Sequence, residues 1–259
     1  MFAIFNTLII YPIVNVLLLF YLFFSNVHLP GALGFALISL TVFIRLILNP
    51  FYSQQMDLSK KMTDIKPELD ALQKKYKDDK KKLQEMQLQL YKDRGINPAG
   101  GCVVGLLQLP FILGLYNALS IFLKDGSIKH VVNDVNSIAY TDILKVTTID
   151  PNFFGFNLAK APSQFHTLGV YYLLIPLVTF FLQYLQGKYT LPSAPKKVKE
   201  PGEKNTQSED MSSIMSTQMK IMFPIMVAYF SYILPVGLAI YWNVFSLFSI
   251  AQYMGKKKA

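Results

Sequence analysis

The chain has 259 residues, of which 52% are hydrophobic and only 16% are charged. Soluble domains usually carry about 25% charged residues, so this composition excludes an ordinary water-soluble globular protein. The formal net charge of +9 could indicate nucleic-acid binding, but 11 of the 25 basic residues lie between Gln54 and Arg94. Such clustering is typical of a membrane protein with basic segments on one side. With one cysteine, Cys102, and three scattered histidines, we expect no intrachain disulfide, no metal and no cofactor.

The first apolar stretch, Met1 to Phe24, carries no charge and lacks the basic start and the cleavage site of a signal peptide. Two placements stay open, because it could cross the membrane as a sixth span or lie along the outer interface. The residues expected to interrupt its first half are Asn6, Thr7, Tyr11, Pro12 and Asn15. They favour an N-terminal interfacial helix and outer loop over residues 1–32.

A membrane-spanning helix needs about 20 mostly apolar residues. Three stretches meet this length, and we predict core spans over residues 33–53, 99–123 and 168–187. A longer apolar run up to Met254 contains Pro235 and Gly237, which favour a helix break. We therefore divide residues 215–254 into a fourth and a fifth span, which form a hairpin.

Lysine and arginine set the orientation, because basic loops stay in the cytoplasm. Residues 54–98 and the basic C-terminal tail 255–259 are predicted inside, and residues 124–167, with four lysines against four aspartates, outside. Residues 188–214 are predicted to form a disordered cytoplasmic linker. The predicted fold is an all-α integral membrane protein with five core transmembrane helices, an N-terminal interfacial or sixth spanning helix, and a cytoplasmic antiparallel helical hairpin.

The hairpin is predicted from apolar residues that recur at spacings of four and three, the pattern of one helix face. They are Leu58, Met62, Ile65, Leu69, Leu72 and Tyr76, and then Leu83, Met86 and Leu90 after a polar turn. Pro67 should kink the first helix or mark its true start. The lysines of the turn are Lys77, Lys80, Lys81 and Lys82. The hairpin is either a solvated decoration or a recruitment surface for anionic lipids, ribosomal RNA or a nascent chain.

Arg45 lies inside the first span, roughly 10 Å below the cytoplasmic interface at about 1.5 Å per residue. An arginine at the centre of a span costs about 2.5–3.5 kcal/mol. The predicted spans contain no aspartate or glutamate, so its donors must meet water, neutral side chains or backbone carbonyls. The candidate partners are Thr41, Gln108, Gln183, Tyr241 and Asn243. We favour a water-filled cavity open to the cytoplasm over an arginine that only snorkels.

Several motifs, in order along the chain, carry a family resemblance. They are Thr41–Leu46 followed by Pro50, Ile65–Leu69, Lys75-Tyr76, Leu90–Lys92, Asn97–Cys102, Gln108–Pro110, Leu115-Tyr116, Phe154–Leu158 and Pro235–Trp242. Together, over about residues 10–254, they resemble the YidC-type membrane protein insertases of bacteria, mitochondria and chloroplasts. Val236 stands where alanine is usual in the family, and Asn243 and Ser246 stand near the place of an expected asparagine. The chain is similar to the short form of the family, without a lipid-attachment cysteine or a large outer domain.

The resemblance implies an insertase and not an enzyme. It implies a hydrophilic groove, open to the cytoplasm and to lipid, whose residues are Arg45, Thr41, Gln108, Tyr241, Trp242 and Asn243. Arg45 would attract the polar or acidic outer tail of a nascent membrane protein, whose apolar helix slides along the second and fourth core spans. Burial of that helix in lipid, at about 25 cal/mol per Å², drives insertion without nucleotide, and the chain has no GxxxxGK[ST] phosphate-binding loop.

The expected location is the inner or plasma membrane, with the C-terminus in the cytoplasm and a monomeric chain. The expected partners are nascent membrane proteins and anionic lipids, with the ribosome and the Sec translocon as further candidates. The alternative function is a secondary transporter that binds an anionic solute through Arg45. Such transporters usually have internal repeats and more spans, and solute uptake into sealed vesicles would separate the two functions.

The lysine distribution gives a testable topology. Single cysteines introduced as Ser137→Cys and Gln84→Cys, each in a Cys102→Ser background, should react differently with an impermeant maleimide on intact cells. Ser137→Cys should be labelled from outside, and Gln84→Cys only after the membrane is opened. Labelling of Gln84→Cys on intact cells would contradict the orientation.

Overall fold

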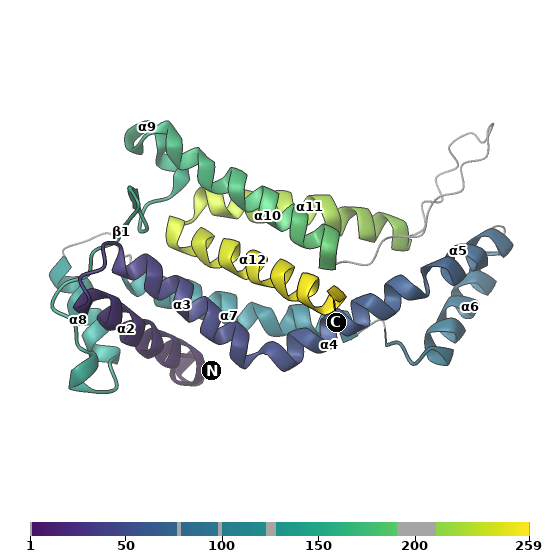
Figure 1. Cartoon of the computed structure of the whole chain (residues 1–259), viewed down its shortest axis with the longest axis horizontal. Coiled ribbons are helices and arrows are strands. Elements are labelled where there is room, and N and C mark those ends of the chain that lie inside the picture. Colours follow the sequence, from purple (N-terminus) through teal and green to yellow (C-terminus); the bar gives the residue numbers. More distant parts are fainter. Residues whose placement is uncertain (1, 77–78, 98–99, 123–127, 191–210, 259) are drawn as a thin grey trace.

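The computed structural model describes residues 2–76, 79–97, 100–122, 128–190 and 211–258, with side chains described except at 2, 3, 80, 100–109, 111, 128, 211–219 and 256–258. Over these ranges the protein is mostly helical, with several apolar helices, as expected for an all-α membrane protein. Figure 1 shows α3, α7, α10, α11 and α12 running along one long axis, with α5 and α6 projecting at one end.

Three described helices are long and apolar enough to cross a membrane, Asn6–Asn26, Val170–Thr190 and Val236–Gly255, and the bent pair α3–α4 gives a fourth. Two other described helices contribute shorter apolar stretches, Ile112–Phe122 and Lys220–Ile233. The number of five core spans therefore stays a prediction.

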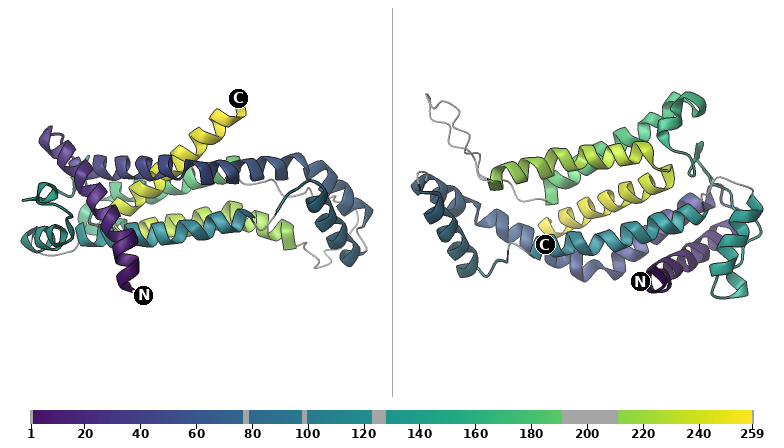
Figure 2. Two further views of the ribbon diagram at one scale, coloured as in Figure 1. Left: turned by 90° about the horizontal axis from the view of Figure 1, so that it is seen from below. Right: turned by 180° about the vertical axis from the view of Figure 1, so that it is seen from behind.

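The N-terminal helix runs without a break through α1 (Phe2–Phe5), η1 (Asn6–Ile10) and α2 (Tyr11–Asn26), so the expected interruption of its first half is wrong. Pro12 lacks the amide that an α-helix uses, and η1 before it widens to a π-helical turn in which Tyr11 donates to the carbonyl of Asn6. Figure 2 shows this helix crossing the long axis of the others obliquely. That course suits the interfacial placement, although its length also suits a span.

The predicted first span, residues 33–53, is broken at Leu48. α3 (Ala32–Ile47) and α4 (Asn49–Asp64) meet at an angle of 68°. Pro50, in the first turn of α4, has no amide to bond the preceding turn, and its ring clashes with a continuing helix. The apolar part of the segment therefore ends in α3, and α4 leads out into the hairpin.

The hairpin consists of α5 (Lys66–Lys75) and α6 (Lys80–Asp93). Pro67 lies in the first turn of α5, so it marks a helix start, one of its two predicted roles. The carboxylate of Asp79 caps α6 by accepting from the amide of Lys82 at 3.0 Å. The predicted turn residues 77–78 lie outside the described residues.

The C-terminal half contains three long helices, α10 (Leu174–Thr190), α11 (Met211–Ile233) and α12 (Val236–Lys258). Leu234 and Pro235 separate α11 from α12, where the sequence predicts a break. α10 ends at Thr190 and α11 begins at Met211, so residues 188–190 and 211–214 of the predicted linker are helical and not disordered. The rest of that prediction, residues 191–210, lies outside the described residues. In Figure 1, α12 lies between α10 and α3, and it packs against both.

The second predicted span forms α7 (Gly100–Phe122), and the predicted outer segment is a compact unit. The unit contains α8 (Ile128–Ile138), η2 (Asp142–Leu144), β1 (Asn152–Phe153), β2 (Phe156–Asn157), η3 (Pro162–Gln164) and α9 (Phe165–Leu168). The next element, η4 (Val170–Leu173), begins the third span. The strands pair antiparallel around a two-residue turn in which Phe154 and Gly155 both have positive φ.

The outer segment fastens the helices at one end. Asn15 of α2 is buried, donates to the carbonyl of Ile138 at 3.0 Å and accepts from the amide of Tyr140 at 2.7 Å. At the start of α12, the amides of Val236 and Gly237 donate to carbonyls of the outer segment at 3.0 Å each. These bonds satisfy two amides that the beginning of a helix leaves free.

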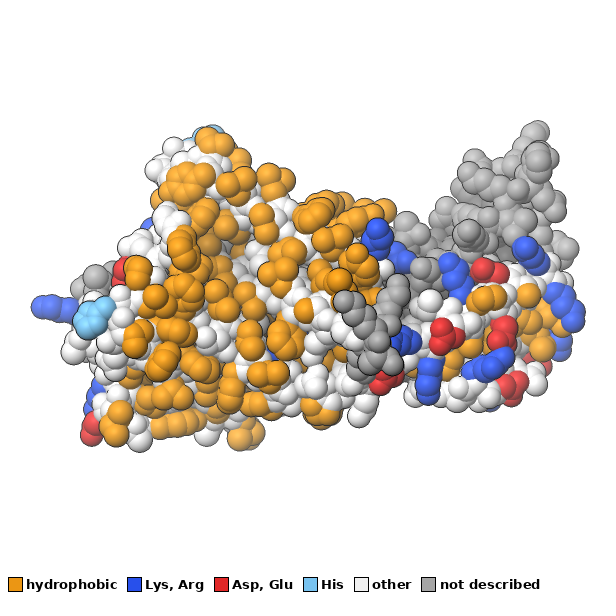
Figure 3. All heavy atoms as spheres, in the orientation of Figure 1, with side chains coloured by type: hydrophobic (Ala, Val, Ile, Leu, Met, Phe, Trp, Pro, Cys, Tyr) orange, Lys and Arg blue, Asp and Glu red, His pale blue; other side chains and the backbone are white. Residues whose placement is uncertain are grey.

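The core is apolar and so is much of the outside. The surface over the helices carries many hydrophobic side chains, whereas charged side chains gather on the hairpin (Figure 3). On α10 and α11 the exposed apolar residues include Leu177, Phe181, Met222, Ile225 and Tyr229. An apolar patch of this kind is expected where a protein faces lipid or another apolar partner.

The contact between Gly34 of α3 and Phe153 of β1 gives a prediction for stability. A Cβ added at Gly34 would lie 2.1 Å from a ring carbon of Phe153, whose ring also packs edge-on against Phe35. Gly34→Ala should therefore lower the free energy of unfolding by about 1–3 kcal/mol, measured by thermal unfolding in detergent micelles. In a Phe153→Ala background the same substitution should cost much less, and an equal cost in both backgrounds would contradict the close contact.

Candidate functional site

The candidate site is centred on Arg45, near the end of α3. Only 2% of the surface of this residue is exposed to solvent. One terminal nitrogen, Nη2, donates to the carbonyl of Phe245 at 3.2 Å and to the hydroxyl of Ser249. Both acceptors belong to α12, so the arginine joins two helices that lie 200 residues apart in the chain.

Aromatic rings surround the guanidinium group. Its central carbon lies 4.0 Å from the ring centres of Tyr52 and Phe245 and 5.5 Å from that of Phe248. Tyr52 and Phe245 also contact each other edge-on, with ring centres 5.8 Å apart. A cation over an aromatic face gains about 2 kcal/mol when it is desolvated.

These contacts explain how the charge is tolerated without a carboxylate. Two neutral oxygens and two close aromatic faces replace part of the hydration that the guanidinium group loses. Their combined stabilisation is of the same order as the cost of burying an arginine in a membrane, about 2.5–3.5 kcal/mol. The compensation is incomplete, because the Nε atom of Arg45 is buried without a hydrogen-bond partner among the described residues. The site therefore holds a positive charge with unused donor capacity.

Tyr241 lies on the side of α12 that faces the arginine, whereas the hydroxyl of Thr41 is hydrogen-bonded within α3. Tyr241 is buried and lies one turn before Phe245, with ring centres 6.0 Å apart. Thr41 is buried and donates to the carbonyl of Leu37 at 2.7 Å. The side chain of Gln108, on α7, lies outside the described residues.

Asn243 does not share this face of α12, because a residue two positions before Phe245 points to another side of the helix. Trp242, three positions before Phe245 and seven before Ser249, is their neighbour on the helix surface. Trp242 is buried, and the Oδ1 atom of Asn243 is buried without a partner in the described part of the chain. The suggestion that Asn243 is a partner of Arg45 is therefore wrong.

Gln183 is also separated from Arg45, by the width of α12. It is buried on α10, in line with Thr179 and Gln186 at helical spacings of four and three. The Oε1 atom of Gln186 is buried without a partner among the described residues, and Ser246 of α12 is fully buried. Buried polar side chains thus occupy the α10 side of α12 as well as the α3 side.

Sequence reasoning missed the aromatic rings around Arg45 and did not pair Ser249 with it. A signal was present, because Tyr52 follows Arg45 by seven residues, and Phe245, Phe248 and Gln252 share one helix face. Because periodicity describes one helix at a time, residue type pointed to Tyr241 and Asn243 of α12 and not to Phe245 and Ser249 of the same helix.

Two more bonds hold α4 near the C-terminal helices. The amide of Gln252 on α12 donates to the Oδ1 atom of Asn49 at 2.7 Å, beside the break at Leu48. Ser59 donates to the carbonyl of Thr190, the last residue of α10, at 2.5 Å. The segment leaving the span is therefore tied to both α12 and α10.

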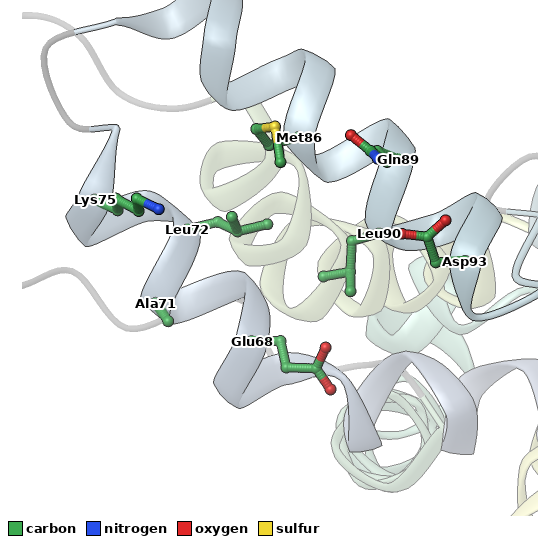
Figure 4. A pocket seen from close by; sticks show the side chains of 8 residues that line it. All are labelled: Glu68, Ala71, Leu72, Lys75, Met86, Gln89, Leu90 and Asp93. Carbon is green, nitrogen blue, oxygen red and sulfur yellow. The ribbon is translucent and has the colours of Figure 1, made fainter.

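A second candidate surface is the groove between α5 and α6, with a volume of about 280 Å³ (Figure 4). Its floor contains Ala71, Leu72, Met86 and Leu90, and its rim contains Glu68, Lys75, Gln89 and Asp93. Arg94 pairs with Glu68 at 2.5 Å and closes the open end of the hairpin. The apolar floor is small, as expected for a short hairpin.

Two of the proposed recruitment lysines, Lys81 and Lys82, lie in the first turn of α6. Lys81 and Lys82 are exposed. The hydrogen bond that Lys82 donates to Glu85, at 3.0 Å, raises the pKa of the ammonium group, so the charge is retained at neutral pH. Lys77 lies outside the described residues, as does the side chain of Lys80. In the described part of the chain no group of histidine, cysteine and acidic side chains has the arrangement of a metal site.

Comparison with known proteins points to one family. The family described as 60Kd inner membrane protein matches residues 23–258. ALBINO3-like protein 1, chloroplastic, of Arabidopsis thaliana is 30% identical over 238 residues, with 90% of this chain and 45% of the relative covered. Membrane protein insertase YidC of Granulibacter bethesdensis is 31% identical over 230 residues, with 87% and 35% covered.

A solved structure shares the fold. It is described as an active YidC insertase with the first transmembrane domain resolved, and it has a TM-score of 0.51 at 24% identity, with 91% of this chain and 44% of that chain covered. This chain spans about half the length, or less, of the relatives it matches.

Proposed function

The chain belongs to the 60Kd inner membrane protein family, the family of YidC-type insertases, and we propose that it inserts nascent membrane proteins through a polar site centred on Arg45. Its YidC relatives support membrane protein insertion as the activity. The observation that carries the proposal is the buried Arg45 at the contact of α3 and α12, which among the described residues meets neutral acceptors and aromatic faces.

The charge of Arg45 suits a polar or acidic tail that must leave the cytoplasm. A carboxylate that reaches the guanidinium group replaces neutral acceptors by a charge-assisted bond, which is about twice as strong. If Arg45 binds the polar segment of the substrate inside the membrane, that segment crosses a shorter distance of hydrocarbon. In this proposal Thr41, Gln108, Tyr241 and Trp242 line a groove that opens to the cytoplasm, and Asn243 adds a buried polar oxygen on another side of α12.

Release into lipid uses the apolar surface of the protein. Exposed side chains such as Met222, Ile225 and Tyr229 give α11 an apolar face along which a substrate helix slides. Burial of that helix in lipid, at about 25 cal/mol per Å², supplies the driving force, so no nucleotide is required. We assign α7 the same role as α11.

The proposed setting is an inner or plasma membrane with the hairpin and the C-terminus in the cytoplasm. The hairpin recruits substrates, through anionic lipids or the ribosome, and a Sec translocon is a further proposed partner. The comparisons do not favour a transporter of anionic solutes.

The role of Arg45 is tested in proteoliposomes that contain the purified protein and a single-spanning substrate, with protection from added protease as the readout. For a substrate with an acidic outer tail, Arg45→Ala and Arg45→Glu should lower insertion by about tenfold or more, because a charge-assisted contact contributes about 1.5–3 kcal/mol. Arg45→Lys keeps the charge and should retain much of the activity.

The matched control is Arg94→Ala, which removes an exposed arginine outside the membrane and should leave insertion unchanged. A substrate with a neutral tail should depend less on Arg45 than the acidic one. Equal insertion of acidic-tailed substrates by the wild type and Arg45→Glu would refute the charge role.

The recruitment surface is tested by replacing Lys77, Lys80, Lys81 and Lys82 with glutamine. Each lysine near an anionic surface contributes about 1 kcal/mol, so association with anionic liposomes or ribosomes should weaken and lose its salt dependence. A control replaces Lys124, Lys129, Lys145 and Lys160, which removes the same charge from the opposite side. If the hairpin variant fails to accumulate in the membrane while the control accumulates, the hairpin is structural and the recruitment role is wrong.

A further inference from the structure

The Nη2 atom of Arg45 is already occupied by this chain's own acceptors. The Ser249 hydroxyl and the Phe245 carbonyl take the bonds that a substrate carboxylate would take, whereas Nε, the neighbouring donor, has no partner among the described residues. Carboxylates bind arginine through two adjacent donors. A substrate carboxylate that uses Nε and Nη2 must therefore displace Ser249 and Phe245.

The same contacts close the space between α3 and α12. Tyr52 follows the break at Leu48 and stacks on the guanidinium group from the α4 side, while Phe245 stacks from α12. The bond between Gln252 and Asn49, at 2.7 Å, adds a second link next to the break. Arg45 is thus the centre of a set of contacts that joins α12 to both sides of the bend between α3 and α4.

We propose that Arg45 and Ser249 form a latch, in which Ser249 is an internal substitute for the acidic group of the substrate and α12 must separate from α3 and α4 before insertion. This inference rests on the proposed insertase function and adds a regulatory step at the same site. Ser249 is a positioning and specificity-determining residue, because it competes for the arginine that selects the substrate. The links are few and neutral, so an incoming carboxylate can replace them.

When the contact between Arg45 and Ser249 breaks, α12 can stay packed against α10. It packs extensively against α10, and Tyr189 and Tyr253 bring their ring centres to 6.0 Å on that side. The outer segment holds the start of α12 through the amides of Val236 and Gly237. Opening is therefore expected at the α3–α12 contact near the bend, away from the outer segment.

The first test uses substitutions of Ser249 and the ratio of insertion rates for acidic-tailed and neutral-tailed substrates. Ser249→Ala removes the competitor and should raise the ratio. Ser249→Asp supplies a permanent carboxylate, so it should lower the ratio by about tenfold, because a charge-assisted bond to Arg45 is stronger than the hydroxyl's. Ser249→Thr keeps the hydroxyl and should behave as the wild type. If the alanine and aspartate variants shift the ratio in the same direction, Ser249 acts through packing and the inference is wrong.

The second test closes the latch reversibly. Asn49→Cys and Gln252→Cys, combined with Cys102→Ser, are joined by a short bifunctional methanethiosulfonate reagent and released with dithiothreitol. The cross-linked protein should lose insertion, and release should restore it. The matched control, Tyr189→Cys with Tyr253→Cys, joins α12 to α10 and should leave insertion unchanged.

The two proposals fail differently. If the wild-type protein inserts no substrate, the insertase function is wrong. If the released double-cysteine protein inserts its substrate and the cross-linked protein inserts it equally fast, only the latch is wrong. If the double-cysteine protein is inactive before treatment, the Ser249 variants, which carry no cross-link, decide whether the latch exists.

Discussion

The structure depends on one constraint, which is that the charge of Arg45 is buried in an apolar helix with no carboxylate to neutralise it. The solution is assembled from three helices: a hydroxyl and a carbonyl come from α12, one aromatic face from α12 and one from α4. Each contact is weak by itself, and together they approach the cost of burying the arginine. A site of this kind is stable but exchangeable, because a stronger acceptor can replace its neutral ones.

The surroundings of α12 determine what the site can do. On one side it faces the arginine, and on the other it packs against α10, where the rings of Tyr189 and Tyr253 meet. The outer segment holds its beginning by two backbone hydrogen bonds. The helix is therefore held at its outer-segment end and along α10, and its contact with α3 combines side-by-side packing with the displaceable polar bonds of Arg45. This arrangement supports entry of a substrate from the side of the bend.

The hairpin differs physically from the rest of the protein. The long helices beside it expose apolar side chains, whereas α5 and α6 carry charged side chains around a small apolar cluster of Ile65, Leu69 and Ile96. A cluster of that size gives a low free energy for local opening. The hairpin suits recruitment at a charged surface, and the apolar helices suit the insertion step.

The sequence by itself determined the class of protein, the apolar helices, the break at Pro235 and the need for neutral partners around Arg45, because these follow from local composition and from residues present or absent. The tertiary structure decided which neutral groups those are. Asn243 and Gln183 were equally good candidates by residue type, but the rotation of α12 and its position between α3 and α10 place Phe245 and Ser249 at the arginine instead. The course of the N-terminal helix likewise depends on its contacts with the outer segment, through Asn15. Hydrophobic periodicity fixes which face of a helix is apolar, but it does not fix which neighbour that face meets.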